Sequence, residues 1–198
     1  RRLPPLADAA WFEPLLSGWY GAVEAHSVDA SPYEQATRVH DMNQPWPPGD
    51  PAPGHYDAVL DFGCLEHVFD FPTAWRNVAA AARTGGHILH ALPCNNLAGH
   101  GFYQFSPELF FNLYRPERGF ELCGVWAAIH TEPRHWWVVA NPLTVRRRVN
   151  LRNGHEVYLL VLARKLAEMP QRQPVQQSDY ALGDWQGTDP VTGFQLVK

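Results

Sequence analysis

Apolar and polar positions along this chain repeat with two different periods, and the changes of period divide it into segments. Over residues 7–20 the apolar side chains recur near helical spacing, which predicts a helix despite Pro14. Residues 23–31, and a stretch that ends at His40, are predicted to form short strands. Prolines and glycines crowd residues 45–54, so no regular structure is expected there.

The middle of the chain alternates between strands and helices. Residues 56–61 are rich in apolar side chains, as in a strand buried on both faces of a parallel sheet, and residues 87–93 form the next predicted strand. Between them, apolar residues at i, i+3, i+4 and i+7 predict a helix over residues 70–83. A second helix is predicted to start at "FSPELFF", where Ser106 is the N-cap and Pro107 the first helical residue.

The last third of the chain contains two more apolar strands. Residues 119–129 and 156–165 are predicted strands on either side of an insertion, residues 130–150, which the pattern does not place. From Pro170 onward Gln, Pro, Asp and Gly dominate, so the end of the chain is expected to be irregular. We therefore predict one domain over residues 1–169 and an irregular tail over residues 170–198 that packs on it.

This order of elements predicts an α/β fold. The expected sheet is Rossmann-like and mostly parallel, with an antiparallel pair formed by the last two strands. Ligands of such sheets bind beyond the carboxyl ends of the strands. Asp29, Asp41 and Asp61 all come at or just after predicted strand ends, so we expect them to gather at one edge.

Composition narrows the choice of partners. The chain has 198 residues, 45% of them hydrophobic, and a net charge of −4, which gives no basic surface for nucleic acid or an anionic membrane. The three cysteines form no CxxC pair, so neither a disulfide framework nor a structural zinc site is expected. No apolar run is long enough to span a bilayer. A cytoplasmic protein that binds a small molecule is expected; its oligomeric state is not predicted.

Two acidic residues have two interpretations each. Asp29 either accepts hydrogen bonds from the ribose hydroxyls of an adenosine-containing cofactor or holds an ordinary turn. Asp41 either forms an Asx-turn or accepts from the exocyclic amine of an adenine, with Met42 against the ring face. The residues alone do not choose between these interpretations.

Longer motifs carry a resemblance. "YDAVLDFGCLEHVF", "GHGFYQFSPELFF" and a late "QQSDY" followed by Trp185 are similar to those of class I S-adenosylmethionine-dependent methyltransferases. Within that family the chain resembles a bacterial group associated with surface-polysaccharide and other glycan loci. The resemblance implies S-adenosylmethionine as cofactor and methyl transfer to a small acceptor, such as a sugar hydroxyl, in glycan biosynthesis.

The resemblance also implies roles for particular residues. Asp29 would hold the ribose, Asp41 and Met42 would line the adenine, and the methionine part would lie against three residues of one turn: Asp61, Phe62 and Gly63. One departure from the family concerns its first strand and glycine-rich turn. The 28 residues before Asp29 contain only Gly18 and Gly21 and no G-x-G, so that strand is expected to be absent from this chain.

Methyl transfer to a hydroxyl also needs a base. His100 is the first candidate, on a loop with Tyr103, and His67 is its rival; each of the three also has a structural interpretation. No metal site is expected, because Gly63 stands where a third ligand would precede the Glu66–His67 pair. The alternative to a methyltransferase is a non-catalytic, methyltransferase-like binding domain or a partner subunit in a glycan pathway.

Overall fold

The computed structural model describes residues 12–132, 134–170, 174–181, 191–192 and 194–197. It divides the chain into two compact units, Arg1–Gln44 and Pro45–Lys198, which we describe separately. The first unit contains helix α1 (Glu13–Tyr20) and a parallel pair of two-residue strands, β1 (Val28–Asp29) and β2 (Arg38–Val39). The predicted helix and both predicted strands are therefore present but shorter than expected, and residues 7–11 lie outside the described residues.

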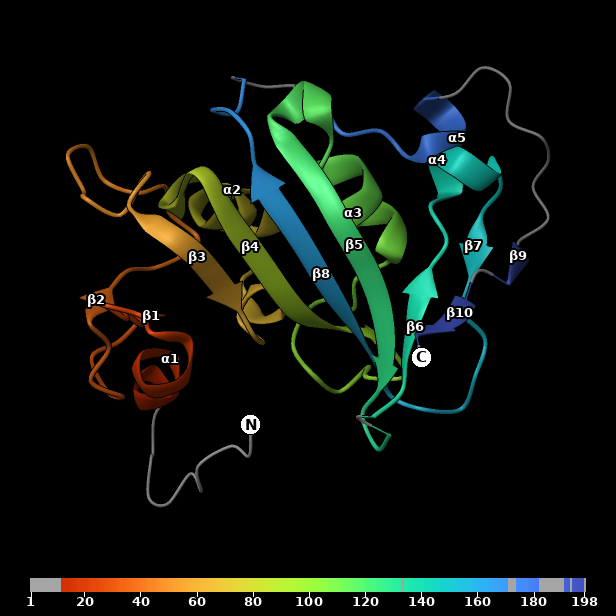
Figure 1. Ribbon diagram of the computed structural model, residues 1–198, viewed down its shortest axis with the longest axis horizontal. Helices are drawn as coiled ribbons and strands as arrows, with labels where there is room; N and C mark the ends of the chain where they lie inside the picture. The colour runs from red at the N-terminus through yellow and green to blue at the C-terminus, as the bar shows by residue number, and fades with distance from the viewer. Residues whose placement is uncertain (1–11, 133, 171–173, 182–190, 193, 198) are drawn as a thin grey trace. The chain divides into compact units, whose positions relative to one another are not determined.

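A six-stranded sheet organises the second unit (Figure 1), in the order β10-β6-β5-β8-β4-β3. Its strands are β3 (Tyr56–Asp61), β4 (Ala82–Asn95), β5 (Phe120–Ile129), β6 (Trp136–Val139), β8 (Val157–Lys165) and β10 (Phe194–Val197). The expected parallel pairing of residues 56–61 with residues 87–93 is confirmed, since β3 runs parallel to β4. The antiparallel pairing of β5 with β8 is confirmed as well.

The prediction of a Rossmann-like, mostly parallel sheet is wrong. Within the described part of this sheet only β3 and β4 are parallel, and all other neighbours are antiparallel. The reason is the place of β8, which lies between β4 and β5 and runs against both. β8 thereby separates β4 from β5, which run in the same direction. The pattern of apolar residues along the sequence does not show that a third strand lies between these two. β3 also ends the order of strands, with Asp57 and Ala58 exposed, so the expectation that it is buried on both faces is wrong too.

Two helices lie behind the sheet in Figure 1, and they follow the predicted boundaries closely. α2 spans Phe71–Ala81, and α3 spans Pro107–Leu113 with Ser106 accepting from the backbone N–H of Glu108. The remaining short elements are η1 (Leu65–His67), η2 (Pro116–Arg118), α4 (Pro142–Val145), β7 (Val149–Asn150), α5 (Ser178–Ala181) and β9 (Val191–Thr192), of which β7 and β9 pair in parallel. None of the helices described is long and apolar enough to cross a membrane.

Aromatic side chains join the helices to the sheet. The ring of Trp75, on α2, contacts Tyr114 at the end of α3 and Phe120 at the start of β5. Phe110 of α3 and Tyr114 both lie against His90 of β4. All of these rings are buried, so the core lies between the two helices and one face of the sheet. Burial of such large side chains supplies most of the driving force for folding this unit.

Asp70 caps the N-terminus of α2. Its carboxylate accepts from the hydroxyl of Thr73 at 2.7 Å and from the backbone N–H of Thr73 at 3.2 Å, and these two bonds, in that order, lower the pKa of Asp70 below its ordinary value of 3.8. A lowered pKa in the folded state stabilises the protein above pH 3.8 and ceases to do so as the pH falls through the folded-state value.

We therefore expect Asp70→Ala to lower the thermal midpoint at neutral pH, by a difference from wild type that shrinks in acid. Asp70→Asn keeps a capping oxygen without a titrating charge and is the matched control. Midpoints measured by circular dichroism along a pH series test the expectation. A difference between Asp70→Ala and wild type that is unchanged at the lowest pH contradicts it.

Candidate functional site

The turn after β3 is held by Asp61. One oxygen of its carboxylate, Oδ1, accepts from the backbone N–H groups of Cys64 at 3.1 Å and Leu65 at 3.3 Å. These bonds close the turn and start η1, which carries Glu66 and His67. Asp61, the last residue of β3, therefore fixes the backbone that carries Glu66 and His67.

Asp61 is in turn held by a buried chain of hydrogen bonds. Its Oδ2 lies 2.6 Å from Nδ1 of His90, and Nε2 of His90 lies 2.5 Å from the hydroxyl of Tyr114. Burial raises the pKa of Tyr114 far above its ordinary value, so the hydroxyl stays protonated. One assignment then satisfies every group: Tyr114 donates to His90, and His90 donates to Asp61.

Glu66 is the central residue of the site. Its side chain is 0% exposed, and Oε1 lies 3.3 Å from Nε2 of His100 and 3.8 Å from Nε2 of His67. The other oxygen, Oε2, is buried and has no hydrogen-bond partner among the described residues. Gly63 leaves room for the carboxylate, because a Cβ atom there would lie 3.3 Å from Oε1, and its φ of +97° favours glycine. We call Glu66, His67 and His100 the Glu66 cluster.

The loop after β4 brings His100 to this cluster. The carbonyl oxygen of Glu66 accepts from the backbone N–H groups of Phe102 at 2.7 Å and Tyr103 at 3.3 Å. Gly101 passes so close that a Cβ atom would lie 2.7 Å from that carbonyl oxygen. The same residue thus anchors the loop through its backbone and faces the histidine of the loop through its side chain.

The two imidazoles form the open side of the cluster. The side chains of His67 and His100 are 53% and 44% exposed, and their ring centroids are 5.1 Å apart. Burial first, and then the charges of Glu66 and Glu156, raise the pKa of Tyr158 above its ordinary value. An open pair of imidazoles over a buried carboxylate suits proton transfer or cation binding.

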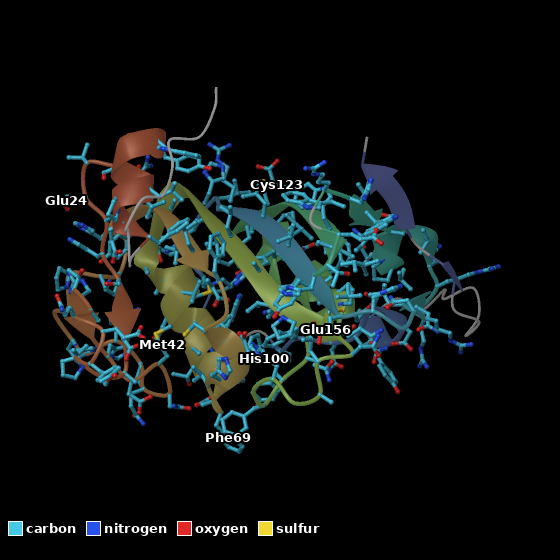
Figure 2. All side chains as sticks on the ribbon, turned by 90° about the horizontal axis from the view of Figure 1, so that it is seen from below. Glu24, Met42, Phe69, His100, Cys123 and Glu156 are labelled. Atoms are coloured by element: carbon cyan, nitrogen blue, oxygen red, sulfur yellow. The ribbon has the colours of Figure 1, made fainter. Side chains whose placement is uncertain are left out.

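An exposed aromatic pair flanks the cluster. Phe69 follows His67 by two residues and Phe102 follows His100 by two; they are 73% and 67% exposed, and their rings meet edge to face. In Figure 2, Phe69 extends away from the ribbon on the side where His100 is labelled. Tyr103 donates its hydroxyl to the carbonyl of Phe69 at 2.6 Å, which ties the two segments together.

The structure brings some of the predicted site residues together. His67, His100 and Tyr103 belong to the two segments just described, and Asp61, Phe62 and Gly63 precede η1 in the same turn. Both oxygens of Asp61 are already engaged by protein groups, so its part in the site is to position the turn.

Asp29, Asp41 and Met42 belong to the first unit, and the expectation that they hold one cofactor together with Gly63 stays a prediction. Asp29 Oδ1 accepts from the N–H and hydroxyl of Ser31, and Asp41 Oδ1 accepts from the N–H and side-chain amide of Asn43. Backbone and side-chain bonds from Asn43 lower the pKa of Asp41. Each acid thus holds a local turn, as one of its two interpretations proposed.

Glu66 is the residue that sequence reasoning did not include among the site residues. Its only signal was its place in the Glu66–His67 pair, and its second partner, His100, lies 34 residues away in sequence. Only the fold shows that one buried carboxylate faces both histidines.

No protein-family model and no curated protein matches the chain. Together with the mostly antiparallel sheet, this finding overturns the resemblance to class I S-adenosylmethionine-dependent methyltransferases. Two of the three motifs that carried the resemblance include the turn and the loop of the Glu66 cluster, and local hydrogen bonds account for the conformations of both.

Proposed function

We propose that this chain is an enzyme that removes the proton from a hydroxyl group of a small acceptor at the Glu66 cluster. We propose that the reaction is the transfer of a methyl group to the oxygen of that hydroxyl. One observation carries the proposal: a fully buried carboxylate, Glu66, faces two half-exposed imidazoles, His67 and His100. The proton transfer rests on this arrangement, and the choice of a methyl group as the group transferred rests on the expectation from the sequence.

The geometry supports the proposal that His100 is the base. When Nε2–H of His100 donates to Glu66 Oε1, at 3.3 Å, the lone pair of the neutral ring lies on Nδ1. Glu66 then fixes the tautomer and stabilises the imidazolium that forms when Nδ1 takes a proton. His67, with its Nε2 3.8 Å from the same oxygen, adds a second group that accepts or shares the proton.

The aromatic pair supports a sugar-like acceptor. Phe69 and Phe102 present apolar faces to solvent beside the histidines, and such faces bind the C–H side of a sugar ring while its hydroxyls reach polar groups. A saccharide precursor in the cytoplasm, as in glycan biosynthesis, is therefore the acceptor that we propose.

S-adenosylmethionine would supply the methyl group, the sulfur keeping the electrons of the broken C–S bond. The acceptor oxygen forms the new C–O bond, and its proton goes to His100. Phe62 and Gly63, at the carboxyl end of β3, are the residues of the second unit proposed to line this cofactor.

A second candidate is a non-catalytic binding domain. Asp29 and Asp41 favour this candidate. Each carboxylate holds a local turn, so the presence of these acids is explained without a cofactor. Calorimetric titration with S-adenosylmethionine separates the two candidates, since only the enzyme requires that ligand.

Transfer of a tritiated methyl group from S-adenosylmethionine to a panel of sugars and sugar nucleotides tests the proposal. We expect labelled product with the wild-type chain and a loss of roughly 100-fold to 10,000-fold in turnover for His100→Ala, the usual contribution of a general base. His87→Ala, an exposed histidine on β4, is the matched control and should retain full turnover. Absence of label on every hydroxyl acceptor, or full turnover in His100→Ala, rejects the proposal.

A further inference from the structure

The unpaired oxygen of Glu66 calls for a ligand. A carboxylate that is withdrawn from water is stable only when its oxygens receive hydrogen bonds or a cation. Oε1 of Glu66 faces two histidines, but Oε2 is buried without a partner among the residues described. The backbone carbonyl of Glu66 accepts hydrogen bonds from the loop that carries His100. These bonds hold Glu66, and with it the side chain, in this position. A ligand that is not one of the described residues is therefore expected to contact Oε2 of Glu66.

We propose that the Glu66 cluster binds one divalent transition-metal cation. The ligand atoms of Glu66, His67 and His100 all lie within 4.8 Å of one another, and Oε1 is 3.3 Å and 3.8 Å from the two imidazole nitrogens. Ligands that each lie about 2.0–2.2 Å from a zinc ion are separated by distances of this order. Small side-chain rotations place all three around one ion.

The ligand set fits a reactive site. Two imidazoles and one carboxylate suit zinc, iron, cobalt or manganese, whereas calcium and magnesium prefer oxygen ligands. Three protein ligands leave at least one position open, and both histidines are about half exposed, so that position faces solvent.

Asp61 acts as a positioning residue for this site. Its carboxylate fixes η1, and therefore the backbone of both Glu66 and His67, through the hydrogen bonds to Cys64 and Leu65. Gly63 keeps the space next to Oε1 free of a side chain. The ligands from η1 are thus preorganised, and only His100 arrives on a loop.

This inference deepens the proposed function and, for its chemical step, rests on it. The bound cation takes the place of the Nε2 proton that His100 shares with Glu66. An acceptor hydroxyl in the open position would be ionised by the metal and would lose its proton to solvent. Its oxygen would then form the new C–O bond as the C–S bond of the methyl donor breaks and the sulfur keeps the electrons. The cation thereby ionises the hydroxyl, whereas in the metal-free cluster Nδ1 of His100 accepts its proton.

Zinc titration of the whole chain tests the site without any substrate. After treatment with EDTA and removal of the chelator, we expect calorimetry to show one zinc ion bound per chain. Glu66→Gln, His67→Ala and His100→Ala should each weaken binding by more than about 100-fold, the upper range for loss of a supporting residue around a metal. His87→Ala, on the exposed side of β4, should bind zinc as the wild type does. Cobalt(II) added to the same proteins should give a visible absorption band that these three variants lose.

The outcomes separate this inference from the proposed function. Zinc binding that depends on the three ligands supports the site even if no methyl transfer is found. Absence of zinc binding by the wild-type chain, or binding that survives both Glu66→Gln and His67→Ala, overturns it. Because His67 is half exposed, its variant folds without a core defect and keeps the test valid if Glu66→Gln is unstable. Full turnover in chelated, metal-free protein overturns the metal's part in the chemistry and leaves His100 as the base.

Discussion

Replacing Gly101 by alanine is expected to destabilise the protein by about 2–5 kcal/mol and to disrupt the Glu66 cluster. The new Cβ atom would lie 2.7 Å from the carbonyl oxygen of Glu66 and 3.0 Å from its Cγ, closer than packed atoms approach. The φ of +74° adds its own cost. A left-handed conformation costs a non-glycine residue about 1–2 kcal/mol, and overpacking costs about 1–3 kcal/mol.

The same loop provides the control for this experiment. Gly99 has no atom within 4 Å of where its Cβ would stand, so Gly99→Ala should change stability by no more than about 0.5 kcal/mol. Urea unfolding gives the stabilities, and zinc calorimetry on both variants reports the cluster. If Gly101→Ala is as stable as Gly99→Ala and binds zinc equally well, the loop does not approach Glu66 as described.

Asp61→Ala is expected to cost roughly 3–5 kcal/mol of stability, the range for breaking a buried, charge-assisted pair. The substitution removes the acceptor of three hydrogen bonds, from His90, Cys64 and Leu65. His90 would keep a buried N–H group without an acceptor, which is more costly than the loss of the bond itself. Because η1 loses its anchor, zinc affinity should fall as well.

Asp57 on the same strand is the matched control. Its side chain is 82% exposed and pairs with Arg83 at the surface, so Asp57→Ala should leave the urea midpoint nearly unchanged. Tyr114→Phe tests the far end of the hydrogen-bond chain and should cost about 1–3 kcal/mol, because it leaves Nε2 of His90 unpaired. Equal stability of Asp61→Ala and Asp57→Ala would show that the buried chain does not hold the turn.

Local sequence chemistry predicted the central elements of the second unit, whereas β6, α4 and β7 fall in residues 130–150, which the pattern left unplaced, and α5, β9 and β10 fall in the segment expected to be irregular. Ser106 and Pro107 marked the start of α3, and the spacing of apolar residues marked α2, because caps and periodicity act within a few residues. The pairings of β3 with β4 and of β5 with β8 followed from the order of strands and helices along the chain and from the apolar runs. The position of β8 between β4 and β5 could not be predicted in this way, because the apolar pattern of a strand is the same whichever strands it pairs with.

The candidate site was predicted only in part, for a similar reason. His67 and His100 were selected as rival bases on separate segments, and the sequence gives no sign that one carboxylate faces both. The expectation of no metal site considered ligands upstream of Glu66 and found Gly63; the third ligand of the proposed site comes instead from a loop 34 residues downstream. Contacts between distant segments depend on the fold, and the fold depends on the strand order that the pattern leaves open.

Diffraction from zinc-soaked crystals of the chain, with data collected on both sides of the zinc absorption edge, tests the central claim most directly. We predict an anomalous peak about 2.0–2.2 Å from an oxygen of Glu66 and from one ring nitrogen each of His67 and His100. A map with no peak at these three side chains at saturating zinc, or with zinc held only by other residues, would contradict the account.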